Sequence, residues 1–108
     1  MIYRQGDVLL VMIDSLPKDA EIVKNKDRIV LAYGEVTGHA HAISVIEAIE
    51  FKAKPVPVFD VQAERFIQVT EKALLKHEEH ATIELPKGDY AILQQRVYTP
   101  EEIKRVED

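Results

Sequence analysis

The stretch RIVLAYGEVTGHAHAISVI, residues 28–46, predicts the fold of the chain. Arg28 to Tyr33 is rich in Ile, Val, Leu and Tyr, and His39 to Ile46 resumes an extended pattern after the loop Gly34 to Gly38. Two such segments joined through a loop bounded by glycines are typical of a β-hairpin. The stretch therefore predicts an antiparallel hairpin whose return carries two histidines.

Other segments of the chain show the same extended character between turns. Asp7 to Asp14 is a nearly continuous aliphatic run and predicts a buried strand. Pro55 and Pro57 restrict their stretch to an edge strand or a connection. Leu85 to Asp89 predicts a turn, and Tyr90 to Tyr98 predicts a long closing strand. Many short strands separated by Gly and Pro predict an all-β fold, mostly antiparallel, built as a sandwich or a small barrel.

Two segments are compatible with a helix. Thr70 to His80 carries helix-forming residues, but a turn at Glu78-Glu79 between two short strands is the favoured interpretation. Thr99 to Glu102 has a Thr N-cap, a Pro at the first helical position and a Glu that completes a capping box. We therefore expect one short C-terminal α-helix, at about residues 100–106.

Composition limits the class of protein. A length of 108 residues with 46% hydrophobic content predicts one β-rich domain, residues 1–108. The absence of cysteine excludes disulfides and sulfur-based zinc sites, so any metal must be bound by nitrogen and oxygen. Val8 to Ile13 is too short for a membrane span of about 20 residues, so we expect a cytoplasmic protein with no membrane partner. The net charge of −5 makes nucleic acid an unfavourable partner.

All four histidines fall into two close pairs, which points to a metal site. On a strand, His39 and His41 share one face and can converge on one ion. His77 and His80 are three residues apart, a spacing that converges on a helix face or across a tight turn. Neutral imidazoles suit a divalent transition metal such as Zn, Ni, Fe, Mn or Cu. The sequence predicts that His39, His41, His77 and His80 bind such an ion together.

Nearby carboxylates are available as ligands, as partners that orient an imidazole, or as a general base. We assign the base to Glu35 or Glu78, because each lies in sequence beside one of the histidine pairs. Two other interpretations remain open. The histidines are either ordinary surface residues of two polar turns, or a pH-responsive contact in which charged imidazoles repel one another.

The spacing Gly34-x4-His39-x-His41, followed later by Pro86-x-Gly88, resembles the cupin superfamily. Cupins are small β-barrels that hold a metal with a Gly-x5-His-x-His motif and with a later histidine after a Pro-x-Gly turn. The resemblance implies a cupin-like barrel and carries over only His39 and His41 as ligands. The cupin glutamate is missing from its usual place after the second histidine, and no histidine follows Gly88.

The chain also resembles a group of small uncharacterised bacterial and phage-encoded proteins. Those proteins share a Gly-Glu-Val-Thr-Gly-His-Ala-His stretch, a His-Glu-Glu-His stretch and a Gln-Arg-x-Tyr segment, which correspond here to Gly34–His41, His77–His80 and Gln95–Tyr98. This resemblance implies no established activity. It implies that Gln95, Arg96 and Tyr98 bind a ligand or cofactor on the same surface as the histidines.

Two classes of function follow from these patterns. In the first, a small β-protein binds a metal at the histidine cluster and either binds a small polar ligand or performs metal-assisted chemistry on it. In the second, the protein is an interaction or accessory module, such as a homodimer formed through the C-terminal helix and the proline-containing edge, and the histidines are structural. Metal content separates the two classes.

Overall fold

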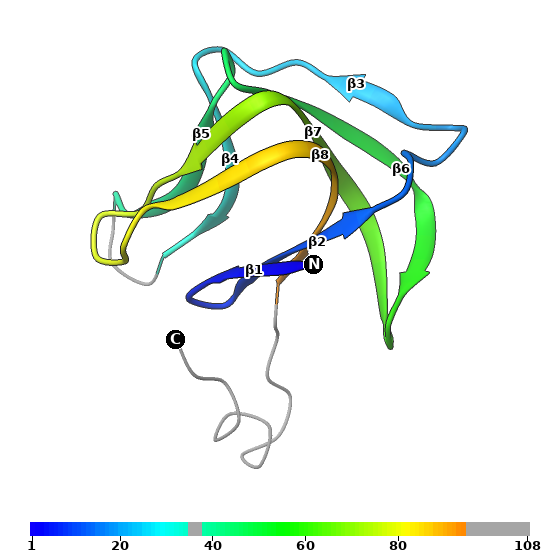
Figure 1. Ribbon diagram of the computed structural model, residues 1–108, viewed down its shortest axis with the longest axis horizontal. Coiled ribbons are helices and arrows are strands. Elements are labelled where there is room, and N and C mark those ends of the chain that lie inside the picture. The colour runs from blue at the N-terminus through cyan, green and yellow to red at the C-terminus, as the bar shows by residue number, and fades with distance from the viewer. Residues whose placement is uncertain (35–37, 95–108) are drawn as a thin grey trace.

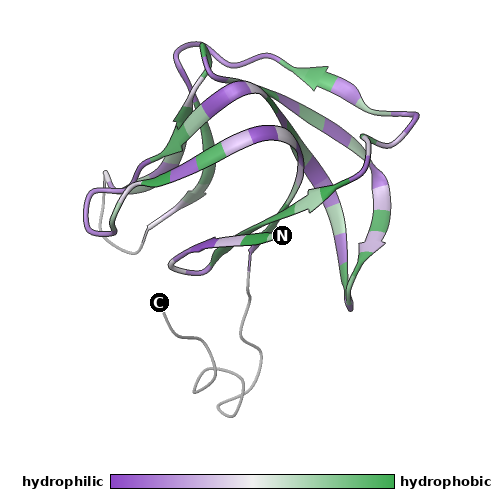
Figure 2. Ribbon diagram, viewed as in Figure 1, coloured by the Kyte–Doolittle hydropathy of each residue, from purple (hydrophilic) through white to green (hydrophobic). Residues whose placement is uncertain are grey.

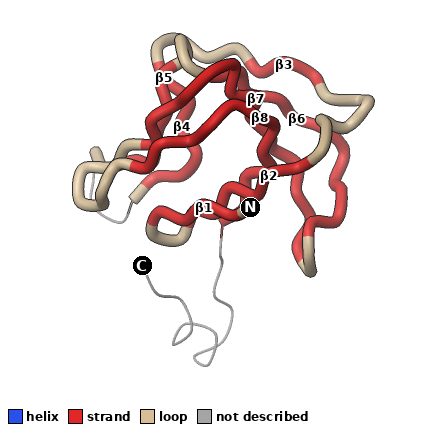
Figure 3. Tube along the Cα trace, in the orientation of Figure 1, coloured by secondary structure: helices blue, strands red, loops and turns tan. Residues whose placement is uncertain are grey.

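The computed structural model describes residues 1–34 and 38–94, and all regular structure within them is β-strand (Figure 3). The strands are β1 (Ile2–Gln5), β2 (Val8–Ile13), β3 (Glu21–Val23), β4 (Arg28–Tyr33), β5 (Ala40–Ser44), β6 (Ala48–Val58), β7 (Val61–Leu75) and β8 (Ile83–Gln94). None of the described residues belongs to a helix that could cross a membrane. The expected C-terminal helix lies outside the described residues.

The strands form two antiparallel sheets (Figure 1). The larger sheet has six strands in the order β1-β2-β8-β7-β6-β3, and the smaller is the β4-β5 hairpin. The long central strands β7 and β8, of 15 and 12 residues, arch across the molecule. β7 also pairs with β6, and β8 with β2. Within the described residues β1 and β3 remain edges that do not pair with each other. The fold is therefore all-β and sandwich-like, and the closed-barrel alternative is wrong.

The predicted hairpin is present. Arg28 pairs with Ser44 and Ile29 with Ile43, and a register shift follows Val30. The other edge of β5 meets the end of β7 at a single bridge. There the amide of Ala42 donates to the carbonyl of Lys76, and the amide of Lys76 donates to the carbonyl of Ala42, both at 2.9 Å. The hairpin is thus attached to the end of the central strand pair.

The core fills the space between the sheets. Leu10, Ile29, Ile43, Leu75 and Tyr90 are almost wholly buried in its larger cluster. The hydroxyl of Tyr90 donates to the carbonyl of Pro86 at 2.6 Å, and burial raises the pKa of Tyr90 to about 12.

A second core cluster lies around Phe66 and covers the other face of the large sheet. The consecutive residues Phe66 and Ile67 on β7 are both fully buried, so both faces of this strand are covered at that point. Burial of each such side chain contributes roughly 1.5–3 kcal/mol. Hydrophobic and hydrophilic residues therefore alternate only along parts of the long strands (Figure 2).

The strand-turn-strand interpretation of residues 70–80 is confirmed, and the helix alternative is wrong. β7 continues to Leu75, and β8 begins at Ile83 after a short loop. The predicted turn at Leu85–Asp89 is also wrong, because β8 passes through it without interruption. Its pairing with β7 contains a register shift between Val69 and Lys72, beside the proline at position 86. Such an irregularity tolerates the missing proline N–H and bends the strands without a turn.

Pro55 and Pro57 lie near the end of β6, as expected for an edge. β3 pairs with β6 only at residues 50–52, so beyond Lys52 one side of β6 has no neighbouring strand in the described part of the chain. A register shift with β7 occurs between Lys52 and Val56. The prolines therefore occupy positions where missing N–H donors cost little.

Arg65 on β7 joins the large sheet to the small one through hydrogen bonds to β4, and it also forms an ion pair within the large sheet. Arg65 donates through Nε to Oε2 of the buried Glu50 at 2.9 Å. Its Nη1 donates to the carbonyl of Leu31 at 2.9 Å, and its Nη2 to the carbonyl of Val30 at 2.7 Å. These two carbonyls lie where the β4-β5 register shifts. One guanidinium thus stabilises both a buried carboxylate and an irregular part of the hairpin.

Replacing Arg65 should destabilise the fold. The change Arg65→Met leaves the Glu50 carboxylate and two backbone carbonyls without their donor, and we expect a loss of about 2 kcal/mol in the free energy of unfolding. Chemical denaturation measures it. The control Lys72→Met breaks the exposed Lys72–Glu84 pair, which spans 3.7 Å, and should cost less than about 0.5 kcal/mol. Equal losses in the two variants would contradict this role for Arg65.

Candidate functional site

Three chain segments meet at one end of the molecule: the β1-β2 turn, the β4-β5 loop and the β7-β8 loop (Figure 1). Hydrogen bonds join them. Gln5 donates through Nε2 to the carbonyls of Leu75 and Ala81, each at 2.9 Å, and so holds both ends of the β7-β8 loop. The amide of Ala40 donates to Oε1 of Glu78 at 2.9 Å, which joins the β4-β5 loop to the β7-β8 loop. The site is therefore assembled from parts far apart in sequence.

The structure brings all four histidines into one cluster. The ring of His77 lies centrally, with its centroid 4.3 Å from that of His41, 4.7 Å from that of His80 and 5.8 Å from that of His39. The rings of His41 and His80 are 5.7 Å apart and nearly parallel. The two pairs thus meet across the β4-β5 and β7-β8 loops. These ring distances place the histidines together, although they do not assign each one a ligand role.

His41 is buried, and its orientation is fixed by Gln5. Because the Gln5 amide nitrogen already donates to two carbonyls, its Oε1 accepts from His41 Nδ1, at 2.9 Å. A neutral His41 ring therefore carries its proton on Nδ1 and presents the lone pair of Nε2. Asp7 Oδ1 lies 3.7 Å from that nitrogen. A histidine oriented through its second nitrogen is the usual arrangement around bound metals.

The β1-β2 turn supplies residues that sequence reasoning missed. Gln94 donates to Oδ2 of Asp7 at 2.9 Å and holds that carboxylate beside His41. Gly6 has a φ of +59°, and a Cβ there would lie 3.0 Å from Nε2 of His80. The backbone conformation and the close approach of the imidazole both favour glycine. The sequence signal was a glycine next to Gln and Asp in a tight turn, but nothing in it indicated proximity to the histidines.

The residues best placed to hold an ion are His39, His77 and Glu78. One ligand atom from each lies within 4.8 Å of the other two. The Nδ1 atom of His39 is buried and has no hydrogen-bond partner in the described structure, while Glu79 Oε1 lies 3.7 Å away. A buried imidazole nitrogen without a partner is costly unless something else binds it.

Glu78 is held as an anion. The hydrogen bond from the Ala40 amide, assisted by the amide of Glu78 itself and by His39 and His77, lowers the pKa of this exposed carboxyl below its ordinary value. A lowered pKa makes a carboxylate a weaker base and a permanently charged group at neutral pH. The geometry therefore favours Glu78 as a metal ligand over the general-base role suggested by the sequence.

His77 already uses one nitrogen. The amide of Glu79 donates to Nδ1 of His77 at 3.0 Å, so a neutral ring carries its proton on Nε2. A Cβ on Gly34 would lie 3.0 Å from that Nε2, and this close approach accounts for a glycine at the hairpin end. Coordination through Nε2 requires the proton to move to Nδ1, and coordination through Nδ1 uses the lone pair directly. Either mode removes the hydrogen bond from Glu79.

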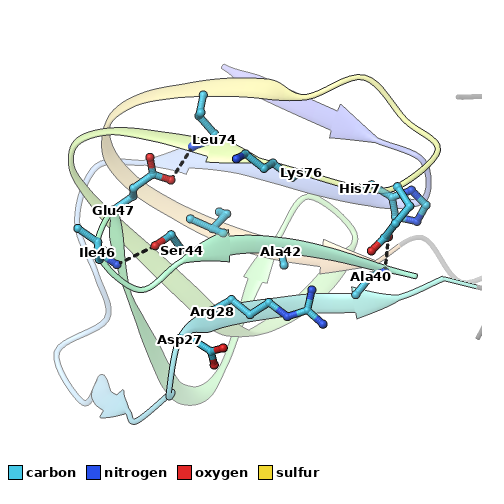
Figure 4. A pocket seen from close by; sticks show the side chains of 12 residues that line it. Asp27, Arg28, Ala40, Ala42, Ser44, Ile46, Glu47, Leu74, Lys76 and His77 are labelled. Atoms are coloured by element: carbon cyan, nitrogen blue, oxygen red, sulfur yellow. Dashed lines mark hydrogen bonds between the residues drawn. The ribbon is translucent and has the colours of Figure 1, made fainter. Parts of the chain in front are cut away.

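Of the other residues assigned from sequence, four lie outside the described residues: Glu35, Gln95, Arg96 and Tyr98. Next to the cluster the structure has a groove of about 660 Å³, whose walls include His77 and Glu78 (Figure 4). The groove follows β5 away from the histidines. A molecule bound in it would reach the candidate metal ligands.

Comparisons with known proteins identify a family. Neither the curated proteins nor the solved structures contain a significant match to the chain. The cupin resemblance therefore receives no support, and neither does a phage or bacterial origin. Residues 4–95 match the family described as "Domain of unknown function (DUF8820)", a span that contains both histidine pairs and the β1-β2 turn. The chain therefore belongs to the DUF8820 family.

Proposed function

We propose that the protein binds a divalent transition metal through His39, His77 and Glu78. The observation that carries this proposal is the convergence of three ligand atoms within 4.8 Å of one another. Ligands at about 2.0–2.2 Å from a tetrahedral ion are roughly 3.4 Å apart, so small side-chain movements would close the site. The partnerless Nδ1 of His39 and the anionic Glu78 both favour a cation at this position.

Two imidazoles and a carboxylate suit several metals. This donor set occurs in catalytic zinc sites and in non-haem Fe(II) sites, and the absence of cysteine removes the thiolate ligands of structural zinc sites. Three protein ligands leave at least one coordination position for water or a bound molecule. Because His77 and Glu78 also line the groove, that position would be accessible to a small ligand there. We therefore favour a site that acts on or binds a ligand over one that only stabilises the fold.

His41 and His80 support the site in this proposal. Both rings pack against His77, and His41 is oriented by Gln5. The carboxylate of Asp7 lies beside His41 and adds negative charge near the cluster. The proposed ligand set therefore takes one histidine from each pair and adds Glu78, whereas the sequence suggested all four histidines.

Metal binding should depend on the residues of this set. We expect Zn²⁺ to bind with one equivalent per chain, and Glu78→Gln to weaken binding at least about tenfold, because it removes an anionic ligand. The matched control Glu71→Gln changes an exposed glutamate of β7 that is not a candidate ligand, and it should leave the affinity unchanged. Calorimetry and elemental analysis of protein without a histidine tag measure both. A metal content near zero after loading with Zn²⁺, Ni²⁺ or Fe²⁺ would reject the proposal.

The amide of Glu79 provides a direct test of ligation by His77. Since coordination through either ring nitrogen removes the hydrogen bond to Nδ1, metal binding should shift the Glu79 amide resonance in an NMR titration. The amide of Phe66, in the remote core cluster, serves as the internal control and should not move. Saturation with metal while the Glu79 resonance stays in place would exclude His77 as a ligand.

Gln5 should act as a positioning residue. The change Gln5→Leu removes the donor to the carbonyls of Leu75 and Ala81 and the acceptor for the Nδ1–H of His41. We expect a loss of at least about 2 kcal/mol in stability. Metal affinity should weaken about tenfold, because Gln5 holds both ends of the loop that carries His77 and Glu78. The control Gln62→Leu alters an exposed glutamine and should change neither quantity. Unchanged metal affinity in folded Gln5→Leu protein would show that this support is dispensable.

A further inference from the structure

The groove beside the histidine cluster has features of a binding site in its own right. Its volume of about 660 Å³ falls within the range of about 300–1,000 Å³ that is usual for small-molecule sites. Its walls come from the start of β4, the length of β5 and the end of β7. It is therefore long enough to hold a small molecule that extends away from His77 and Glu78.

Small side chains form the floor of the groove. Ala40, Ala42 and Ser44 occupy alternate positions along β5 and line the groove together with Ile43, while His41 is buried in the cluster. This alternation follows from the two-residue period of a strand. Large side chains at the alternate positions would fill the groove, so the sequence Ala-His-Ala-Ile-Ser keeps it open.

Two cations flank this floor. Arg28 pairs in register with Ser44, and Lys76 with Ala42, so their side chains share the groove face with those small residues. Figure 4 shows Arg28 and Lys76 on opposite sides of β5. Two strand spacings and a two-residue offset along β5 separate their backbones by roughly 12 Å, a distance that both long side chains can bridge to reach a group above Ala42.

Both cations lack an acidic partner. Arg28 and Lys76 are exposed, and neither forms an ion pair within residues 1–34 and 38–94. Of the three carboxylates that line the groove, two accept hydrogen bonds from the backbone, and Asp27 forms no ion pair with either cation within the described residues. Glu47 accepts from the amide of Leu74 at 3.1 Å, and Glu78 accepts from the amide at position 40. In a chain of net charge −5, two unpaired cations over a shared floor are a specific attraction for an anion.

We infer that the groove binds a small organic anion, with its carboxylate or phosphate group between Arg28 and Lys76. The guanidinium donates two parallel hydrogen bonds to such a group, and the ammonium supplies a second positive charge. The body of the molecule lies along β5 toward His77 and Glu78. This inference goes beyond the metal proposal and does not depend on it, because neither cation is a candidate metal ligand.

An NMR titration tests the inference with succinate and glycerol phosphate as probes, at constant ionic strength. Succinamide and glycerol are the matched neutral compounds. We expect at least one of the anions to shift the amides of Ala42, Ser44 and Lys76, and the neutral compounds to leave them in place. The double variant Arg28→Gln/Lys76→Gln should bind that anion at least about tenfold more weakly, since a charge-assisted hydrogen bond contributes more than 1.4 kcal/mol, which is about tenfold in affinity.

The control Lys54→Gln/Lys87→Gln removes the same charge from exposed residues outside the groove and should retain binding. Each titration is repeated with and without Zn²⁺. Anion binding that persists without metal and weakens in the groove variant supports the inference even if metal binding fails. If the anion binds only when metal is present, and binds the groove variant as tightly as the original protein, the anion is bound by the metal instead. That result would overturn the inference, as would a lack of binding by both anions or equal binding of the neutral compounds.

Discussion

The bridge between Ala42 and Lys76 is the contact on which the rest of the site depends. Its two hydrogen bonds attach the β4-β5 hairpin to the end of β7, immediately before His77. This backbone pairing, together with the hydrogen bond from the Ala40 amide to Glu78, holds the loop that carries His39 next to the loop that carries His77. Because backbone hydrogen bonds set a register, the bridge fixes both the distance between the loops and the face on which each side chain lies.

Polar groups around the histidines orient the imidazole rings that the bridge brings together. Gln5 fixes the proton of His41, and the Glu79 amide occupies Nδ1 of His77. Carboxylates of Asp7, Glu78 and Glu79 lie around these rings. Imidazole nitrogens next to carboxylates are the donor set on which the metal proposal rests.

Sequence reasoning predicted the hairpin and the convergence of histidines within each pair, because both depend on residues close together in the sequence. The hydrophobic runs on either side of Gly34 and Gly38 predict the hairpin, and the local spacing of the histidines predicts that each pair can converge. The role of Gln5 was not predictable, since its partners lie 70 and 76 residues further along the chain. The turn expected at Leu85–Asp89 failed for a related reason. The local signal was real, but pairing with β7 kept the segment extended.

The segment from His39 to Ser44 contributes to both proposed sites through one structural property. Alternate residues of β5 face opposite ways, so the buried His41 belongs to the cluster while Ala42 and Ser44 line the groove. A slip of one residue in the register would exchange these faces, placing an imidazole in the groove and an alanine in the cluster. The histidine cluster and the groove therefore depend on the same register of this strand. A change in that register would disturb both.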